Sequence, residues 1–305
     1  MTDAPAPAAG SRGKALAALI FGAAVIGLAP ILARLTETGP AAAGAWRLSF
    51  ALPMLAVIAL RTAPGSSLRP HPAALLAGVM FALDMGFWHY SLAYTSVANA
   101  TVLTNLTPVV VTAVAWFAFG QRPRPAFLAA VALAVAGAAL MTVGREGAAG
   151  RNPPLGDGLA LTTALWYAFY MLAIGVARRT QAATMVMFWS SLVGMPLLFI
   201  AAAALGEDII PRGAAGWAAC VGLGVVHVAG QGAIAWALGR LETATASVVI
   251  LVQPVVAAIL GWLLFAEAVG RRQAVGAALA LGGVILAQRV AGTVITSPRT
   301  AKPAG

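Results

Sequence analysis

The sequence predicts an all-α membrane protein with ten transmembrane helices, arranged as two inverted five-helix repeats. Three observations predict this fold class: the composition, the series of long apolar runs, and a similarity between the two halves of the chain. Hydrophobic residues make up 61% of the sequence and charged residues only 9%, whereas soluble domains carry about 25% charged residues. A soluble fold of 305 residues has too little interior for so much apolar side chain, so the whole chain is expected to lie in a membrane.

Each predicted helix is an apolar run close to the length that crosses a bilayer, which is about 20 residues. Only short polar breaks separate several of these runs, so neighbouring helices are expected to form antiparallel hairpins. The runs are continuous rather than alternating, which favours helices over strands. The ten runs are 15–33, 41–60, 73–94, 98–119, 126–143, 159–177, 184–205, 214–238, 243–265 and 274–291.

A repeat relates the two halves of the sequence. Pro108 begins the run PVVVTAVAWFAF and Pro254 begins the run PVVAAILGWLLF, with a tryptophan eight residues after the proline in both. Further residues match at the same or nearly the same offset: Phe119 with Phe265, Gly137 with Gly283, Trp46 with Trp189 and Pro53 with Pro196. Because each copy has five helices, an odd number, the second copy enters the membrane inverted. Inverted repeats are typical of secondary transporters, whose substrate site lies near the midplane between the halves.

The repeat divides the chain into two units with a short tail at each end. We expect a disordered tail over residues 1–13, repeats over 14–145 and 156–291, and a second tail over 292–305. With the N-terminus in the cytoplasm, twelve basic residues fall on the inner side and six on the outer side, in agreement with the positive-inside rule. The six outer residues are Arg34, Arg145, Arg151, Arg212, Arg271 and Arg272. The chain is therefore predicted to span the inner membrane with both termini in the cytoplasm.

Two segments carry a resemblance to a known family. The segments YTSVANATVLTNLTPVVVTAVAWFAF and LETATASVVILVQPVVAAILGWLLFAEA closely resemble the EamA-type unit of the drug/metabolite transporter superfamily. The resemblance covers residues 14–291 and implies a ten-helix transporter of small metabolites, commonly an exporter. The sequence departs from the family pattern at Gln121, where a glutamate is usual, whereas Glu267 keeps that glutamate in the second copy.

Pro108 and Pro254 are expected to bend the fourth and ninth helices at mid-depth. Proline lacks an N–H and displaces the carbonyl four residues earlier, which in the first copy belongs to Thr104. A freed carbonyl is tolerated at this depth where protein or a water-filled cavity satisfies it. Polar Asn105 and Gln253 stand near the two prolines, so we predict two hinges that face a central substrate path. A bend that serves helix packing alone is the alternative.

Several polar residues lie at the depth of the bilayer, where an ionisable group costs about 2.5–3.5 kcal/mol and is expected to face the bundle interior. Asp84 lies in the middle of the third run, with Trp88 one helical turn later and His89 beside it. His227 and Gln231 lie in the equivalent helix of the second copy. These two helices are therefore predicted to line one polar, substrate-binding cavity from both sides.

Each of these side chains has a functional and a structural interpretation. Asp84 carries a proton or a substrate ammonium group, or it forms a structural pair with Arg47 on the neighbouring helix. The two histidines relay protons, or they are hydrogen-bonded residues of the interior. Trp166 and Tyr170 on the sixth helix stack on a substrate, or they pack as ordinary aromatic residues.

No sequence motif points to catalysis, a cofactor or a metal ion. The chain lacks a glycine-rich phosphate-binding loop, a nucleophile motif and a cluster of metal ligands, and Cys220 is its single cysteine. The basic residues lie between apolar runs, so topology rather than nucleic-acid binding explains the net charge of +10. The expected partners are a small-molecule substrate, the lipid bilayer and, as a hypothesis, protons.

We therefore predict a secondary transporter that exports small metabolites such as amino acids by alternating access. Three alternatives are efflux of cationic drugs or quaternary ammonium compounds, a channel-like facilitator, and a membrane enzyme or regulator. The last is the least favoured, because the sequence carries no motif for chemistry.

Overall fold

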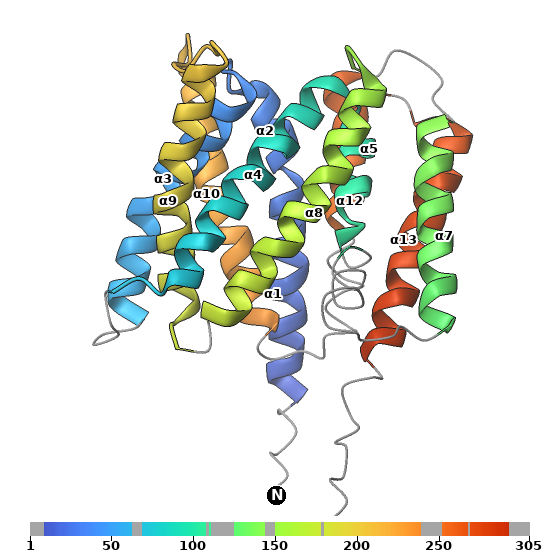
Figure 1. Ribbon diagram of the computed structural model, residues 1–305, viewed down its shortest axis with the longest axis horizontal. Helices are drawn as coiled ribbons and strands as arrows, with labels where there is room; N and C mark the ends of the chain where they lie inside the picture. Colours follow the sequence, from blue (N-terminus) through green and yellow to red (C-terminus); the bar gives the residue numbers. More distant parts are fainter. Residues whose placement is uncertain are drawn as a thin grey trace, which may run out of the picture.

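The computed structural model describes residues 9–62, 69–107, 110, 125–143, 150–177, 180–238, 252–267 and 269–292. These residues form a bundle of α-helices, with no β-strand among them (Figure 1). The first half contributes α1 (Ala9–Gly27), α2 (Ala29–Leu35), α3 (Pro40–Thr62), α4 (Pro72–Tyr94), α5 (Val97–Thr104) and α7 (Pro125–Val143). The second half contributes α8 (Pro153–Ala177), α9 (Ala183–Ala204), α10 (Ala214–Leu238), α12 (Val252–Phe265) and α13 (Arg271–Gly292).

The helices fall on the predicted apolar runs. Two of the shorter apolar helices cover 125–140 and 255–265. Residues 111–124 and 239–251 lie outside the described part, so the fourth and ninth runs are described only in part. Within the described ranges, six helical segments are long and apolar enough to cross a membrane: 13–35, 40–61, 72–94, 153–174, 184–204 and 214–234.

Local sequence signals fix where α4 and α5 begin. Pro72 opens α4, at a position where a helix does not need the missing N–H. The Nδ1 atom of His71 accepts a hydrogen bond from the backbone N–H of Ala73 at 3.1 Å and caps this helix. The hydroxyl oxygen of Ser96 accepts from the N–H of Asn99 at 3.1 Å and caps α5 in the same way. The polar break between these helices is therefore only a tight corner.

Most contacts between the two halves come in matching pairs. Helix α4 packs on α8 as α10 packs on α1, and α4 packs on α9 as α10 packs on α3. Likewise α5 packs on α8 as α12 packs on α1. Three further pairs join helices that are equivalent in the sequence repeat: α3 with α9, α5 with α12, and α7 with α13. Contacts of α2 with α10 and α12, and of α5 with α13, also join the halves. Exchanging the two halves therefore preserves most of this pattern of contacts.

Helices α7 and α13 approach each other closely at one side of the bundle (Figure 1). A Cβ atom at Gly137 would lie 2.2 Å from the backbone nitrogen of Ala280, and a Cβ at Gly283 would lie 2.4 Å from that of Ala134. Small residues allow this approach of two backbones within a membrane. Gly137 and Gly283 also match in the repeat, so the same small face occurs once in each half.

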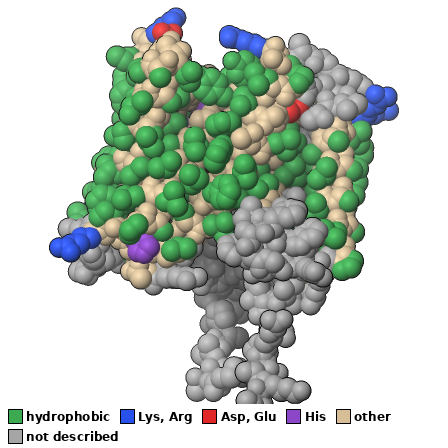
Figure 2. All heavy atoms as spheres, viewed as in Figure 1, with side chains coloured by type: hydrophobic (Ala, Val, Ile, Leu, Met, Phe, Trp, Pro, Cys, Tyr) green, Lys and Arg blue, Asp and Glu red, His purple; other side chains and the backbone are tan. Residues whose placement is uncertain are grey.

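Apolar side chains cover most of the face shown in Figure 2, and the coloured basic and acidic side chains lie toward its two ends. This distribution suits a bundle that meets lipid along its sides and water at its ends. Helix α1 begins and α13 ends at the same end of the bundle, which is the lower end in Figure 1. We call the opposite end, where α2 and α4 finish, the upper end.

Candidate functional site

A cluster of charged and aromatic side chains lies inside the bundle, around the middle of α4. Asp84 on α4, Arg47 on α3 and His227 on α10 are each at most 3% exposed. The ring of Phe81 on α4 stacks on Tyr170 of α8 with ring centroids 4.7 Å apart, and it lies 5.5 Å from the ring of His227. The fold thus brings polar residues from four helices to one place, which we call the central cluster.

Asp84 and Arg47 supply the opposite charges of the central cluster. They are close enough to interact electrostatically, but no ion pair or hydrogen bond joins them in the described part of the chain. The guanidinium carbon of Arg47 lies 5.8 Å from the ring centroid of Trp88, within the range of a cation–π contact. Both charged groups therefore keep hydrogen-bonding capacity for water or a ligand.

His89 lies next to the central cluster, nearer the upper end of α4. Its Nδ1 atom lies 2.7 Å from the carbonyl oxygen of Met85, and because a carbonyl only accepts, this nitrogen carries the proton. In the neutral form of the ring the Nε2 atom is then an acceptor, and it is buried without a partner among the described residues. The imidazole also contacts the ring of Trp88, with centroids 4.8 Å apart.

Buried polar atoms without a partner gather around this site. Such an atom costs about 1–3 kcal/mol when nothing satisfies it, and water or a ligand usually does. Within the described residues, the atoms are Arg47 Nε, His89 Nε2, Ser91 Oγ, Trp166 Nε1, Trp189 Nε1, Ser191 Oγ and His227 Nδ1. Three of these residues, Arg47, His89 and His227, lie in or beside the central cluster. The cluster is therefore suited to bind a polar molecule.

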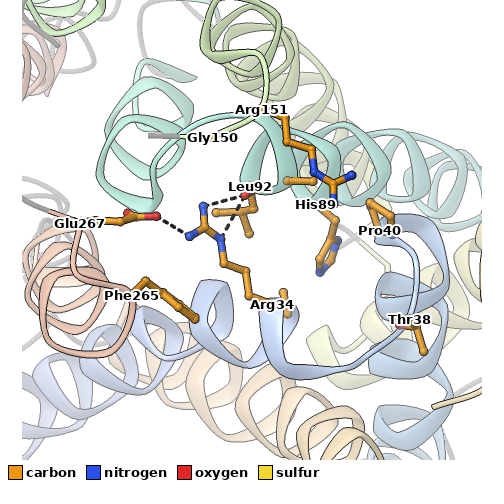
Figure 3. Close-up of a pocket in the computed structure, with 11 residues that line it drawn as sticks. Arg34, Thr38, Pro40, His89, Leu92, Gly150, Arg151, Phe265 and Glu267 are labelled. Carbon is orange, nitrogen blue, oxygen red and sulfur yellow. Dashed lines mark hydrogen bonds and ion pairs between the residues drawn. The ribbon is translucent and has the colours of Figure 1, made fainter. Parts of the chain in front are cut away.

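A cavity of about 690 Å³ opens near the upper end of the bundle (Figure 3). His89 lines it, so the cavity reaches the edge of the central cluster. Its volume lies in the range of small-molecule sites, about 300–1,000 Å³. The other polar residues that line this upper cavity are Arg34, Thr38, Arg151 and Glu267.

Arg34 forms one wall of the upper cavity and is held on several sides. Its guanidinium pairs with Glu267 and donates to the carbonyl oxygens of Leu92 at 2.7 Å and Thr95 at 2.8 Å. Glu267 also accepts from the backbone N–H of Val97 at 2.8 Å, at the start of α5. These bonds tie α2, α4 and α5 of the first half to the end of α12 in the second half (Figure 3).

Two more carboxylates join the halves at the upper end. Glu207, which follows α9, accepts from the backbone N–H groups of Ala41 at 3.2 Å and Ala42 at 2.9 Å, at the start of α3. Glu37, which precedes α3, accepts from the N–H of Gly213 at 2.9 Å, just before α10. Negative charge is favourable at a helix N-terminus, so each carboxylate stabilises the start of a helix in the other half.

A buried polar network lies apart from the cavity, where α5, α8 and α13 come near one another. Asp157 accepts from the hydroxyl of Thr95 at 2.7 Å and from the amide of Asn99 at 3.3 Å. The amide of Gln273 in turn donates to the hydroxyl oxygen of Ser96 at 3.4 Å. These groups satisfy one another, so the network fixes how the three helices pack.

The structure brings together five of the residues that the sequence predicts to bind substrate. Asp84, Trp88, His89, Tyr170 and His227 all lie in or beside the central cluster. The predicted structural charge, Arg47, lies there too.

The other four predicted binding residues make their described contacts elsewhere. Trp166 lies beside an aromatic ring of α4, with centroids 6.1 Å apart. The amide of Asn105 donates to the carbonyl oxygen of Thr101 at 2.7 Å, within its own helix. Gln231 on α10 and Gln253 on α12 are half-buried.

The two predicted hinges are described only in part. Pro108 lies outside the described residues, and Pro254 is the third residue of the described part of α12. Helix α5 ends at Thr104, whose carbonyl oxygen accepts from the hydroxyl of Thr107 at 2.8 Å. The carbonyl that Pro108 is predicted to displace therefore has a side-chain donor.

No binding role was predicted from the sequence for the charged residues of the upper cavity, and Glu267 was noted only as the glutamate that the second copy keeps. Arg34 and Arg151 belong to the minority of basic residues that the topology assigns to the outer side. A basic residue on that side departs from the positive-inside pattern, and this departure is the signal that marks them for attention.

A helical membrane bundle with a polar interior and a small-molecule cavity is the architecture of a membrane transporter. The chain belongs to the EamA-like transporter family, whose sequence profile matches residues 13–143 and 154–288. The predicted family is therefore confirmed, and the protein is a multi-pass membrane transporter and not an enzyme, acting on small molecules in a lipid bilayer.

No curated protein matches the chain. A solved crystal structure of another protein resembles it with a TM-score of 0.64 and 21% sequence identity. The alignment covers 94% of this chain and 99% of that chain, so the likeness concerns the whole fold.

Proposed function

We propose that the protein is a secondary transporter of the inner membrane that exports small polar metabolites, such as amino acids, by alternating access. In this proposal residues 14–145 and 156–291 are five-helix repeats of opposite orientation. The tails over 1–13 and 292–305 lie in the cytoplasm, and the upper end of the bundle faces outward.

The pattern of helix contacts supports the inverted repeat. Most contacts between unlike helices of the two halves have a counterpart when the halves are exchanged, as those of α4 with α9 and α10 with α3 do. The beginning of α1 and the end of α13 lie at one end of the bundle, as an even number of crossings requires (Figure 1). Rocking of one repeat against the other about bends at Pro108 and Pro254 is the proposed motion.

The central cluster is the main observation that supports the proposal. A charged pair that is buried in helices long enough to span a membrane is costly, so its position inside the bundle marks a functional site. Asp84, His89 and His227 supply polar atoms, and Trp88 and Tyr170 supply aromatic walls. Asn105, Trp166, Gln231 and Gln253 are proposed as outer members of the same substrate path.

Proton coupling is proposed to act through Asp84. Its carboxyl group is buried, and no ion pair holds it in the described part of the chain. A proton that binds there removes a buried negative charge and leaves the positive charge of Arg47 unbalanced. The free energy of the cluster then depends on protonation, and this dependence is what coupling to a pH gradient requires.

Transport by purified protein in proteoliposomes tests the function. We expect uptake of at least one member of a panel of labelled amino acids and other small metabolites when a pH gradient is imposed, and loss of accumulation when an ionophore collapses it. Asp84→Asn is expected to abolish the gradient-driven component, whereas Asp208→Asn, at an exposed pair outside the cavity, is the matched control. Full gradient-driven transport by Asp84→Asn excludes that residue as the coupling group.

Efflux of cationic drugs or quaternary ammonium compounds is the second candidate. The buried carboxyl group of Asp84 favours it, because an acid inside the bundle attracts a cation. Arg47 lies within electrostatic range and offsets that attraction. Transport of labelled tetraphenylphosphonium in the same vesicles, with no transport of the metabolite panel, would decide in favour of this candidate.

A further inference from the structure

We propose that the upper cavity binds the acidic group of a small organic acid, with Arg151 as its ionic partner and His89 Nε2 as the acceptor for a hydroxyl or amino donor on the same molecule. This inference rests on the proposed function and names the substrate class. It also makes Arg151 a residue that determines specificity.

The charge of the cavity lining favours an anion. Among the described residues, Arg34, Arg151 and Glu267 are the groups of fixed charge that line it, and these three leave one net positive charge. Arg34 is committed to Glu267 and to two backbone carbonyls. Arg151 has no acidic partner among the described residues, so its guanidinium is the group available for a ligand carboxylate.

Arg151 is held in place although its side chain is exposed. The preceding Gly150 has a φ of +95°, and a Cβ atom there would lie 2.1 Å from the carbonyl oxygen of Tyr94. The following Asn152 donates its backbone N–H to the same carbonyl at 3.3 Å. Because both neighbours pack on the end of α4, the backbone that carries Arg151 is fixed relative to His89, which lies on that helix.

His89 supplies the second point of recognition. Its side chain is only 3% exposed, its Nδ1 donates to the carbonyl oxygen of Met85, and its Nε2 has no partner in the described part of the chain. Figure 3 shows the imidazole and the Arg151 guanidinium at the same opening. An acceptor buried at the edge of a cavity is satisfied by a donor that a ligand brings there, such as a hydroxyl or an amino group.

The other residues that line the cavity indicate what the rest of the ligand is. Leu92, Ala93 and Phe265 line the cavity with apolar surface. The guanidinium carbon of Arg34 lies 5.1 Å from the ring centroid of Phe265, so this ring is fixed as well. The site therefore suits a hydroxy acid or amino acid with an apolar side chain, and it disfavours a molecule whose only charge is positive.

Binding to the full-length protein in detergent tests the assignment. The probes are the apolar L-amino acids, the matching 2-hydroxy acids and the methyl ester of each, which removes the acidic group and keeps the donor. We expect at least one acid to raise the unfolding temperature and its ester to have no effect. Arg151→Gln is expected to weaken the binding of that acid at least tenfold. Arg212 is an exposed arginine outside the cavity, so Arg212→Gln is expected to leave the affinity for the acid unchanged.

A second variant tests the role of His89. His89→Phe keeps a ring and removes the acceptor, so it is expected to weaken the binding of the 2-hydroxy acid at least fivefold. The matching acid without a hydroxyl is expected to bind both forms equally. This comparison uses two ligands on one variant, so a general loss of fold is distinguished from the loss of one hydrogen bond.

Three results would overturn the assignment: esters that bind as tightly as acids, acids that bind Arg151→Gln with unchanged affinity, or no binding by any acid. Transport of neutral or cationic molecules alone would overturn the assignment of the cavity, but it would still support a transport function. Binding of acids without transport of any metabolite would leave the cavity assignment in place and remove the proposed function.

Discussion

The carboxylate of Glu267 pairs with the guanidinium of Arg34 and joins the end of α12 to the end of α2 beside the upper cavity (Figure 3). The two side chains are only 14% and 21% exposed. Each has further hydrogen bonds to backbone groups of the first half. This pair therefore lies where a movement of one half against the other would change its surroundings.

Glu267→Gln is expected to lower the free energy of unfolding by about 1–3 kcal/mol, because it leaves the partly buried guanidinium of Arg34 without its anion. Arg34→Gln is expected to have a similar effect. The double variant should show a coupling energy of about 0.5–3 kcal/mol between the two residues. Denaturation by SDS in mixed micelles measures all three values.

The exposed pair of Arg212 and Asp208 is the control for this experiment. Its side chains are 78% and 65% exposed, and exposed pairs contribute about 0–1 kcal/mol. Arg212→Gln should therefore change stability little. Equal losses for both pairs would show that the contact between Arg34 and Glu267 adds nothing specific.

Gly137→Ala is expected to destabilise the protein by about 1–3 kcal/mol, because a backbone shift must relieve the overlap of the new methyl group with α13. A Cβ atom there would lie 2.2 Å from the nitrogen of Ala280. Gly282 lies on α13 with no atom within 4 Å of such a Cβ. Gly282→Ala should be neutral or stabilise by up to about 1 kcal/mol through helix propensity. The same sign for both variants in SDS denaturation would contradict the close packing of α7 and α13.

Much of the fold follows from the sequence because the bilayer restricts what an apolar run can do. Six predicted runs are long apolar helices in the structure, and two more are shorter ones. The match of Gly137 with Gly283 predicts equivalent small faces, and the structure places both where α7 meets α13. Length and periodicity alone predict these elements, since a segment in lipid must satisfy its own backbone.

The site is less completely predictable from the sequence, because it depends on contacts between distant segments. Asp84 and His227 were predictable from the high cost of burying polar groups in a membrane. Arg34 and Glu267 are separated by more than two hundred positions. Neither Arg34, as a charge at a helix end, nor Glu267, as the glutamate kept in the second copy, indicates the other as its partner. Their meeting depends on how the two halves pack, and no local pattern carries that information.

Glu207→Ala is expected to lower stability by about 1–2 kcal/mol, the usual cost of losing a helix cap. Its carboxylate accepts from two backbone N–H groups at the start of α3 and from the hydroxyl of Tyr90. Glu207→Gln keeps one amide oxygen as an acceptor, so its loss should be smaller. Stability is measured by SDS denaturation, and an equal loss for both variants would mean that the side chain acts by packing rather than by capping.

Thr107→Val tests how the chain satisfies the carbonyl that Pro108 is predicted to displace. Valine has nearly the shape of threonine, so the change removes the hydroxyl that donates to the carbonyl oxygen of Thr104 at 2.8 Å and little else. We expect the free energy of unfolding to fall by about 1 kcal/mol, within the range measured for side-chain hydrogen bonds in membrane helices.

Thr162→Val is the control. The hydroxyl of Thr162 donates to the carbonyl oxygen of Gly158 inside the regular helix α8, where a backbone donor already serves that carbonyl. Thr162→Val should therefore change the free energy of unfolding little. Equal stability of wild type and Thr107→Val in SDS denaturation would mean that water or another group satisfies the carbonyl of Thr104.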